Sequence, residues 1–314
     1  MIVVFGSFNM DVVMRLERLP GPGETVLGGD YMLVPGGKGA NQACAAARAA
    51  RAAKGSAVTV AMVGKVGADD WGDLVLGRLS EAGVDLDAVG RGKSPTGCAL
   101  ISVDAAGENA ISVASGANLE ADAAQVPEQM LKLGHWLVLQ MEVPPEENWH
   151  LIERARRCDC KVLLNVAPAA SVPEDVLEAV EVLVFNAVEG LMLAESGGLA
   201  AKDPVEVARR LSDTYDLTAI ATLGPAGAVA FAPGESWRVA ALPVTPVDTT
   251  GAGDAFVGSL VAALEAEAGL PQALRRASVA AGICCETPGT QTSFPWAVQI
   301  EDRLTELDPP RPIS

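Results

Sequence analysis

The alternation of strand-like apolar runs with helical patterns over residues 121–232 limits the fold of this chain more than any other feature. The pattern predicts helices at 121–132, 146–157, 174–179, 188–195 and 204–214, and strands at 135–140, 161–165, 181–185, 217–222 and 228–232. Such alternation implies parallel strands joined by right-handed crossovers, with helices on both faces of the sheet. We therefore expect an α/β protein with three layers, α/β/α, around a mostly parallel central sheet.

The N-terminal third adds two features to this pattern. Residues 2–8 predict a further strand, and a helix is expected from Gln42 to about Ala53. The segments at about 12–35 and 95–114 instead contain short strand patterns separated by glycine-containing turns, which predicts a small accessory sheet. We treat residues 1–314 as a single domain with this sheet inserted, and we expect the proline-rich end, 308–314, to be a loose tail.

Polar residues follow several of the predicted strands. In open sheets of this kind, ligands bind at the carboxyl ends of the strands. Four segments fall at such ends: Gln140-Met-Glu142, Asn165-Val-Ala-Pro168, Asn186-Ala-Val-Glu189 and Thr222-Leu-Gly224. The sequence therefore predicts a binding site along this edge.

The stretch Asp248-Thr-Thr-Gly-Ala-Gly-Asp254 predicts a glycine turn that opens a helix. The first N–H groups of a helix have no partner within it, and the helix dipole makes that end positive, so the turn is a ready anion site. A carboxylate at an anion site is repelled by the ligand. Asp254 is explained if it takes a proton from an alcohol that attacks a bound phosphate. The alternative is an acid that merely favours a helix N-terminus. The loop matches neither a Walker A motif nor the dinucleotide fingerprint.

Two further segments have both a structural and a functional interpretation. Asn9 and Asp11 follow the first strand; they are either turn formers or a pair that hydrogen-bonds sugar hydroxyls. Gly36-Gly-Lys-Gly-Ala-Asn41 lets backbone approach a ligand closely, and Asn41 either caps the next helix or contacts that ligand.

The charge balance narrows the possible partners. The chain has 23 basic and 40 acidic residues, a net charge of −17, which argues against binding to nucleic acid or an anionic membrane. No apolar run approaches the roughly 20 residues that span a bilayer, and the N-terminus is interpreted as a strand, not a signal peptide. The six cysteines lack zinc spacing, and they are expected to be idle thiols in a reducing, cytoplasmic compartment.

These motifs together resemble the ribokinase-like sugar kinases of the phosphofructokinase-B type, over nearly the whole chain. The resemblance includes Gly6-Ser-Phe-Asn9-Met-Asp11, Gly36-Gly-Lys-Gly-Ala-Asn41-Gln, Thr96-Gly97, Asn186 with Glu189, Thr222-Leu-Gly224, the 248–254 loop and Gly289-Thr-Gln-Thr-Ser-Phe-Pro-Trp296. The Gly-Ala-Gly-Asp loop marks the family and is specific in this context.

The resemblance implies a role for each matching residue. The sugar would be bound by Asn9, Asp11, Gly37, Lys38, Asn41, Glu142 and Asp254. Asp254 would also be the catalytic base. The anion hole for the transferring phosphoryl group would be formed by Gly251, Ala252 and Gly253. The nucleotide would lie along Asn186, Thr222, Gly224, Gly253 and Ser278. Magnesium would be placed through water by Asn186 and Glu189, and potassium would be held by Asp248, Thr250, Cys284, Thr287, Gly289 and Ser293, largely through main-chain carbonyls.

The expected activity is ATP-dependent phosphorylation of the primary 5-hydroxyl of D-ribose to give ribose 5-phosphate. The accessory sheet would be a lid over the sugar and the contact of a homodimer. A kinase of the same family for fructose, a nucleoside or a keto-deoxy sugar acid is the main alternative; a dinucleotide dehydrogenase and a non-catalytic sugar sensor are the others. The sequence departs from the family at three places. Ala187-Val188 are apolar where the family often has polar residues, and Cys284 replaces another small residue. Thr287-Pro288 stand where ribokinase-like members have basic residues.

Overall fold

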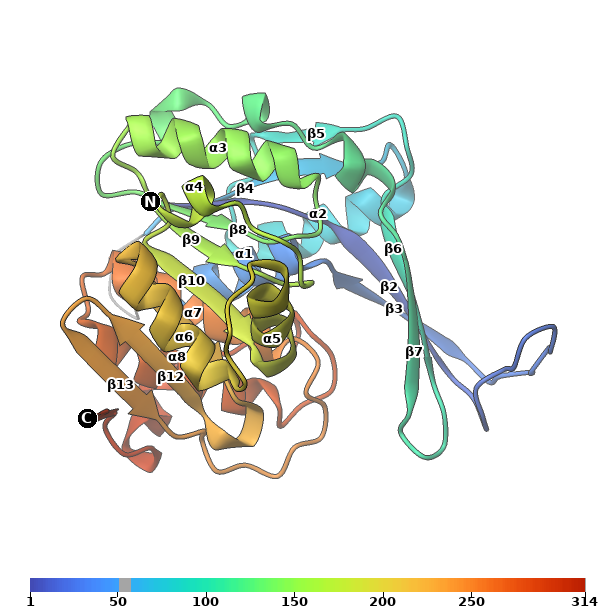
Figure 1. Cartoon of the computed structure of the whole chain (residues 1–314). Coiled ribbons are helices and arrows are strands. Elements are labelled where there is room, and N and C mark those ends of the chain that lie inside the picture. Colours follow the sequence, from blue (N-terminus) through green and yellow to red (C-terminus); the bar gives the residue numbers. More distant parts are fainter. Residues whose placement is uncertain (51–57, 314) are drawn as a thin grey trace.

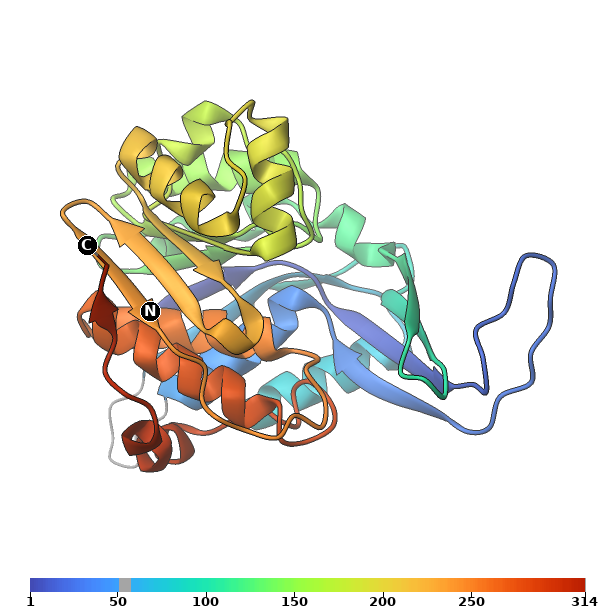
Figure 2. The same ribbon diagram turned by 60° about the horizontal axis from the view of Figure 1, so that its bottom comes forward.

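The computed structural model describes residues 1–50 and 58–313. A ten-stranded sheet runs through these residues, with helices on both faces (Figure 1, Figure 2). In their order across the sheet, the strands are β14 (Arg311–Pro312), β13 (Glu235–Val239), β12 (Ala228–Ala232), β11 (Thr218–Thr222), β10 (Val182–Asn186), β9 (Lys161–Asn165), β8 (Trp136–Leu139), β1 (Ile2–Phe5), β4 (Val60–Val66) and β5 (Val89–Arg91). Neighbours run parallel from β11 to β5, while β12, β13 and β14 are antiparallel additions. The expected three-layer α/β/α fold is confirmed.

The two faces of the sheet build separate apolar cores, because successive strand residues point to opposite sides. In β1, Ile2 and Val4 enter one core, while Val3 and Phe5 enter the other. The first core is covered by α1 (Lys38–Ala50), α2 (Asp70–Ala82), α7 (Ala252–Glu265), α8 (Leu270–Cys284) and α9 (Ala297–Arg303). The second is covered by α3 (Pro145–Arg157), α4 (Glu174–Leu177), α5 (Ala187–Ser196) and α6 (Pro204–Tyr215). Burial on both faces explains the continuous apolar runs of the parallel strands.

Helices α1 and α7 lie against each other at very short range. A Cβ at Gly258 of α7 would come within 2.6 Å of the Ala45 side chain and 2.7 Å of the Ala46 backbone nitrogen. Glycine and alanine at this contact therefore allow the helix backbones to approach. The approach brings the first turn of α1 beside the first turn of α7, where Asp254 lies.

A second sheet of four strands extends away from the body of the molecule (Figure 1). Its order is β3 (Tyr31–Gly36), β2 (Asn9–Arg15), β6 (Gly97–Val103) and β7 (Asn109–Ala114). The predicted accessory sheet is thus present. Because β2 follows β1 after only a short connection, the start of this sheet lies at the carboxyl end of the central one.

Two predicted elements are wrong. The helix expected at 121–132 is replaced by two short 3₁₀ turns, Ala123–Gln125 and Glu128–Met130. Between them, Pro127 lacks an N–H and cannot continue a helix. The tail expected at 308–314 is not loose as far as it is described, because β14 pairs with β13 and Ser236 Oγ donates to the Ile313 carbonyl at 2.8 Å.

The described part of α1 ends at Ala50, so the end of this helix predicted near Ala53 lies outside the described residues. In the residues that are described, no helix has both the length and the apolar character needed to cross a lipid bilayer.

Candidate active site

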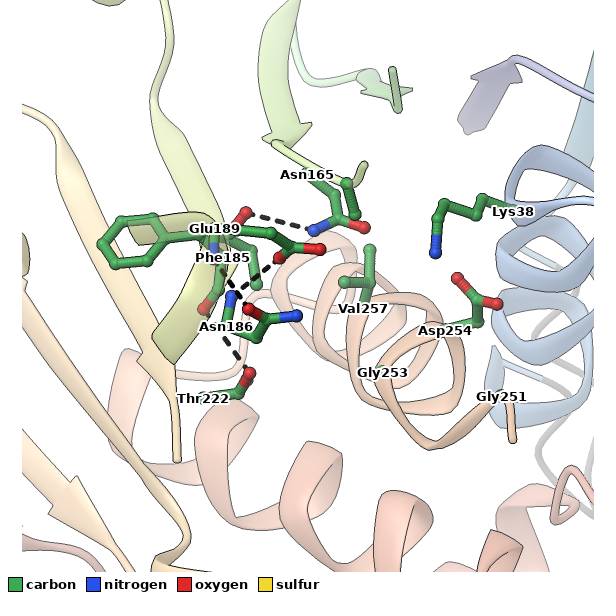
Figure 3. Close-up of a pocket in the computed structure, with 12 residues that line it drawn as sticks. Lys38, Asn165, Phe185, Asn186, Glu189, Thr222, Gly251, Gly253, Asp254 and Val257 are labelled. Atoms are coloured by element: carbon green, nitrogen blue, oxygen red, sulfur yellow. Dashed lines mark hydrogen bonds between the residues drawn. The ribbon is translucent and has the colours of Figure 1, made fainter. Parts of the chain in front are cut away.

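A cavity of about 210 Å³ lies where the carboxyl ends of β9, β10 and β11 face the start of α7 (Figure 3). Each of these strands ends in a polar residue that lines the cavity: Asn165, Asn186 and Thr222. Lys38 and Asp254 close its other side, and Figure 3 shows the Lys38 amine pointing towards the Asp254 carboxyl group. The cavity therefore lies at the strand ends where the sequence predicts a binding site.

The start of α7 places an acid beside the first backbone N–H groups of a helix, of which that of Ala252 donates to the Thr249 carbonyl at 3.2 Å. Gly251 precedes the helix with a positive φ of 79°, and the helix begins at Ala252. A Cβ built on Gly253 would meet no atom within 4 Å, so this residue leaves open space for a ligand next to the helix N-terminus. Asp254, on the same turn, is buried with 8% of its surface exposed.

Two amide side chains hold the Asp254 carboxyl group. Asn41 Nδ2 donates to Oδ2 and Gln42 Nε2 donates to Oδ1, each at 3.0 Å. Burial raises the pKa of Asp254, while the nearby Lys38 charge and the two amide donors oppose the rise. A carboxyl group poised in this way is a candidate proton acceptor.

The predicted sugar-binding residues form one charged group next to Asp254. Burial lowers the pKa of Lys38, but the attraction of Asp254 and Glu142 outweighs it, so the amine stays protonated. Glu142 Oε2 accepts from the Lys38 backbone N–H at 2.9 Å and from Ser7 Oγ at 2.6 Å. Burial, followed by the charges of Glu142 and Asp254, raises the pKa of Asp11 to about 7.

Gly37 and Asn9 complete this group. Gly37 lies immediately before α1 with a φ of +89°, packed on the backbone at Ser7 and Asn9. The Asn9 oxygen Oδ1 accepts from Asn118 Nδ2 at 2.8 Å, and Asn118 is itself fixed by the Phe8 backbone. Asn118 therefore fixes the orientation of the Asn9 amide by donating to its oxygen.

The raised pKa of Asp11 predicts a pH-dependent loss of stability. An Asp side chain ionises near 3.9 in the unfolded chain and here near 7 in the folded one, so the folded state binds more protons between those values. The contribution of Asp11 to the free energy of unfolding therefore falls as the pH rises from about 4 to 7. We expect Asp11→Asn to raise the urea midpoint relative to wild type by more at pH 8 than at pH 4.5. An equal difference at both pH values would contradict the assigned ionisation.

A second cavity, of about 530 Å³, lies on the other side of Gly253. Thr222 and Gly253 line both cavities, so the two adjoin each other. Of the predicted nucleotide residues, Thr222, Gly224, Gly253 and Ser278 line the second cavity, while Asn186 lines the first. The walls of this second cavity are otherwise largely apolar, and no sequence motif indicates the loop residues Leu242, Pro243 and Val244 that line it. An apolar cleft next to an anion site suits a flat base attached to phosphates.

Asn186 and Glu189 form a reciprocal cap at the start of α5. Asn186 Oδ1 accepts from the Glu189 N–H at 2.9 Å, and Glu189 Oε2 accepts from the Asn186 N–H at 2.8 Å. The two side chains are therefore fixed at the wall of the first cavity. Val188 is 66% exposed and takes no part in the cap, so the apolar departure from the family does not disturb the pair.

The residues predicted to hold potassium come from the loop before α7, from the last residue of α8 and from the loop after α8. Asp248 accepts from the N–H groups of Thr250 and Gly289, each at 2.9 Å. Ser293 Oγ donates to the Gly289 carbonyl at 2.9 Å and lies 3.0 Å from Cys284 Sγ. The Cys284 thiol also lies 3.6 Å from the Thr250 carbonyl. Thr287 lies in the loop between Cys284 and Gly289. A set of carbonyl oxygens beside one carboxylate fits a hard monovalent cation. Among the described residues no cluster of three or more His, Cys, Asp or Glu side chains could hold a metal.

Four buried amide side chains and one hydroxyl surround the predicted site residues, although no role is predicted for them from the sequence. Ser7, Gln42, Asn118 and Gln291 are fully or almost fully buried and contact predicted site residues, and the fully buried Gln140 donates to Gln42. The available signal was a polar side chain in an otherwise alanine-rich or apolar segment, which requires an internal partner when buried.

Known proteins resemble this chain over nearly its whole length. Residues 1–297 match the family described as pfkB family carbohydrate kinase. The ribokinase of Lactococcus lactis is 33% identical over 310 residues, covering 98% of each chain. The structure of ribokinase from Thermotoga maritima superimposes with a TM-score of 0.87 at 29% identity, covering 97% of this chain and 99% of that one. The Arabidopsis thaliana ribokinase complexed with ribose and ATP has a TM-score of 0.84 at 28% identity, covering 96% and 98%.

Proposed function

This chain belongs to the pfkB family of carbohydrate kinases, and from that premise we propose that it transfers the γ-phosphoryl group of ATP to the primary 5-hydroxyl of D-ribose. Relatives named ribokinase that are at least 30% identical over nearly the full chain support this substrate. The observation that carries the proposal is the position of Asp254: a buried carboxyl group at the mouth of a helix, beside the glycine that separates the two cavities.

In the proposed reaction, ribose occupies the side of Asn9, Asp11, Gly37, Lys38, Asn41 and Glu142. ATP lies in the second cavity along Thr222, Gly224 and Ser278, with its phosphates directed at Gly253 and Asn186. Asp254 takes the proton of the ribose 5-hydroxyl while the oxygen of that hydroxyl bonds to the γ-phosphorus. The bond from that phosphorus to the bridging oxygen breaks, and ADP leaves. The N–H groups at Gly251, Ala252 and Gly253 stabilise the charge on the transferring group.

Two ions are part of the proposal. Asn186 and Glu189 would hold magnesium through water, which would neutralise phosphate charge. Asp248, Thr250, Cys284, Thr287, Gly289 and Ser293 would hold potassium, and a cation there adds a positive field beside the anion hole. In a protein of net charge −17, such local positive fields are what allow a polyphosphate to bind.

We further propose that the four-stranded sheet is a lid, formed by about 12–35 and 95–114, on the single domain. Closing it over the sugar would exclude water as a competing acceptor. Its apolar residues include Tyr31, Met32, Leu100, Ile111 and Val113, all more than half exposed. The strand register places Tyr31 and Leu100 on one face of this sheet and Met32, Ile111 and Val113 on the other. Exposed apolar side chains on the lid support a homodimer through it, which sedimentation analysis would test. The free cysteines support a cytoplasmic enzyme.

ADP release tests the function. We expect turnover with D-ribose to exceed that with fructose, a nucleoside or a keto-deoxy sugar acid, and to rise when potassium replaces a large organic cation. Preference for one of the other acceptors would reassign the substrate within the family. Ribose binding without any ADP release would instead identify a sugar sensor.

A further inference from the structure

A chain of buried amides leads from the core of the sheet to the Asp254 carboxyl group. Asn165 Nδ2 donates to the Val184 carbonyl at 3.1 Å, and Asn165 Oδ1 accepts from Gln42 Nε2 at 2.9 Å. Gln42 Nε2 also donates to Asp254 Oδ1 at 3.0 Å, while Gln42 Oε1 accepts from Gln140 Nε2 at 2.8 Å. Gln42 and Gln140 are both fully buried. The Gln42 amide thus uses both N–H groups and its oxygen within this network.

The two ends of the chain dictate which way the Gln42 amide faces. A backbone carbonyl such as that of Val184 can only accept, so Asn165 must turn its N–H₂ to it and its oxygen to Gln42. An ionised Asp254 also only accepts. The Gln42 N–H₂ group must therefore face both Asn165 Oδ1 and Asp254 Oδ1. Flipping the Gln42 amide would place its oxygen against these two acceptor oxygens. Gln140 likewise turns its N–H₂ group to Gln42 Oε1, although its own Oε1 is then buried without a hydrogen-bond partner.

We propose that Gln42 is a positioning residue that holds Oδ1 of the Asp254 carboxylate in place for proton transfer. This inference rests on the proposed function, in which Asp254 is the base. Gln42 lies in the interior and makes no contact with either cavity in the structure, so its effect passes through Asp254. The other oxygen, Oδ2, faces Asn41, which is a proposed sugar contact. Oδ2 is accordingly the oxygen that receives the proton, while Oδ1 remains bound to Gln42.

The hydrogen bond from Gln42 favours the ionised form of Asp254, which gives the proposal a measurable signature. Gln42→Met keeps the length of the side chain and removes the donor. We expect kcat to fall by about tenfold to a hundredfold, as for the loss of a hydrogen bond to a charged group, with the KM for ribose changed less than about threefold. The acidic limb of the pH–kcat profile should move to higher pH, because the carboxylate loses a stabilising donor.

Gln125→Met is the matched control, since Gln125 Nε2 donates to the Gly64 carbonyl and contacts none of the site residues. It should keep the wild-type kcat and pH profile. If Gln42→Met does not fold, Gln140→Met removes the partner of Gln42 Oε1 without touching Asp254, and it should move the pH profile in the same direction. Wild-type kcat and pH profile in the folded variant would overturn the inference.

The outcome for Asp254→Asn separates this inference from the proposed function. If Asp254→Asn retains turnover, the assignment of the base fails, and with it the premise. If Asp254→Asn is nearly inactive but Gln42→Met matches wild type, only the positioning role fails. If Asp254 is the base and Gln42 positions it, adding Gln42→Met to Asp254→Asn should cause no further loss of kcat, because the two residues act as one unit.

Discussion

We expect Asp254→Asn to lower kcat by about 10²–10⁴-fold while ribose and ATP still bind. Asn has almost the same shape as Asp but cannot accept the proton of the sugar hydroxyl. The variant also faces two donors, Asn41 and Gln42, with a side chain that offers one acceptor oxygen instead of two. Coupled ADP release measures kcat, and calorimetric titration measures binding of each substrate.

The pH dependence distinguishes loss of a base from loss of structure. In wild type, turnover should fall as the pH falls through the pKa of Asp254, which burial raises above the usual range of an aspartate. The acidic limb should disappear in Asp254→Asn. Asp213→Asn, an exposed position on α6, provides the control and should keep the wild-type profile. Near-normal turnover in Asp254→Asn would remove the basis of the mechanism.

Much of the architecture could be predicted because it depends on local pattern. Apolar strands, glycine turns and helical spacing repeat along the chain, and parallel sheets bring their carboxyl ends to one edge. That rule alone gathers Asn165, Asn186 and Thr222 at one cavity. The incorrectly predicted helix at 121–132 contains Pro127, and a proline inside a helix disfavours it more than the nearby alanines favour it.

The features that were missed depend on residues far apart in the sequence. Strand β14 pairs with β13, about 70 residues earlier, and a short proline-containing segment gives no sign of such a partner. The amides around Asp254 are similar. Gln42 is 212 positions from Asp254 and 123 from Asn165, and only the packing of α1 on α7 brings them together. Sequence pattern predicts which residues are buried, but not which buried polar groups meet.

The second large effect is expected at Gly253, the residue that lines both cavities. We expect Gly253→Val to lower kcat/KM for ATP by about 10²-fold or more, with Gly253→Ala intermediate. The added carbons would occupy the space next to the helix N–H groups, where the transferring phosphoryl group is proposed to lie. The loss should appear in both kcat and the KM for ATP, whereas ribose binding should change little.

Gly253→Val should not lower the stability of the folded protein. Unchanged stability distinguishes a blocked phosphate site from a misfolded one. A Cβ at Gly253 meets no atom within 4 Å in the structure, and replacing a helical glycine reduces the freedom of the unfolded chain. The urea midpoint of Gly253→Val should therefore match or exceed that of wild type. Gly77 on α2 is an equally open helical glycine far from the cavities in sequence, so Gly77→Val should keep both stability and turnover. If Gly253→Val turned over ATP normally, the phosphoryl group could not lie against this turn, and the boundary between the two cavities would have no catalytic role.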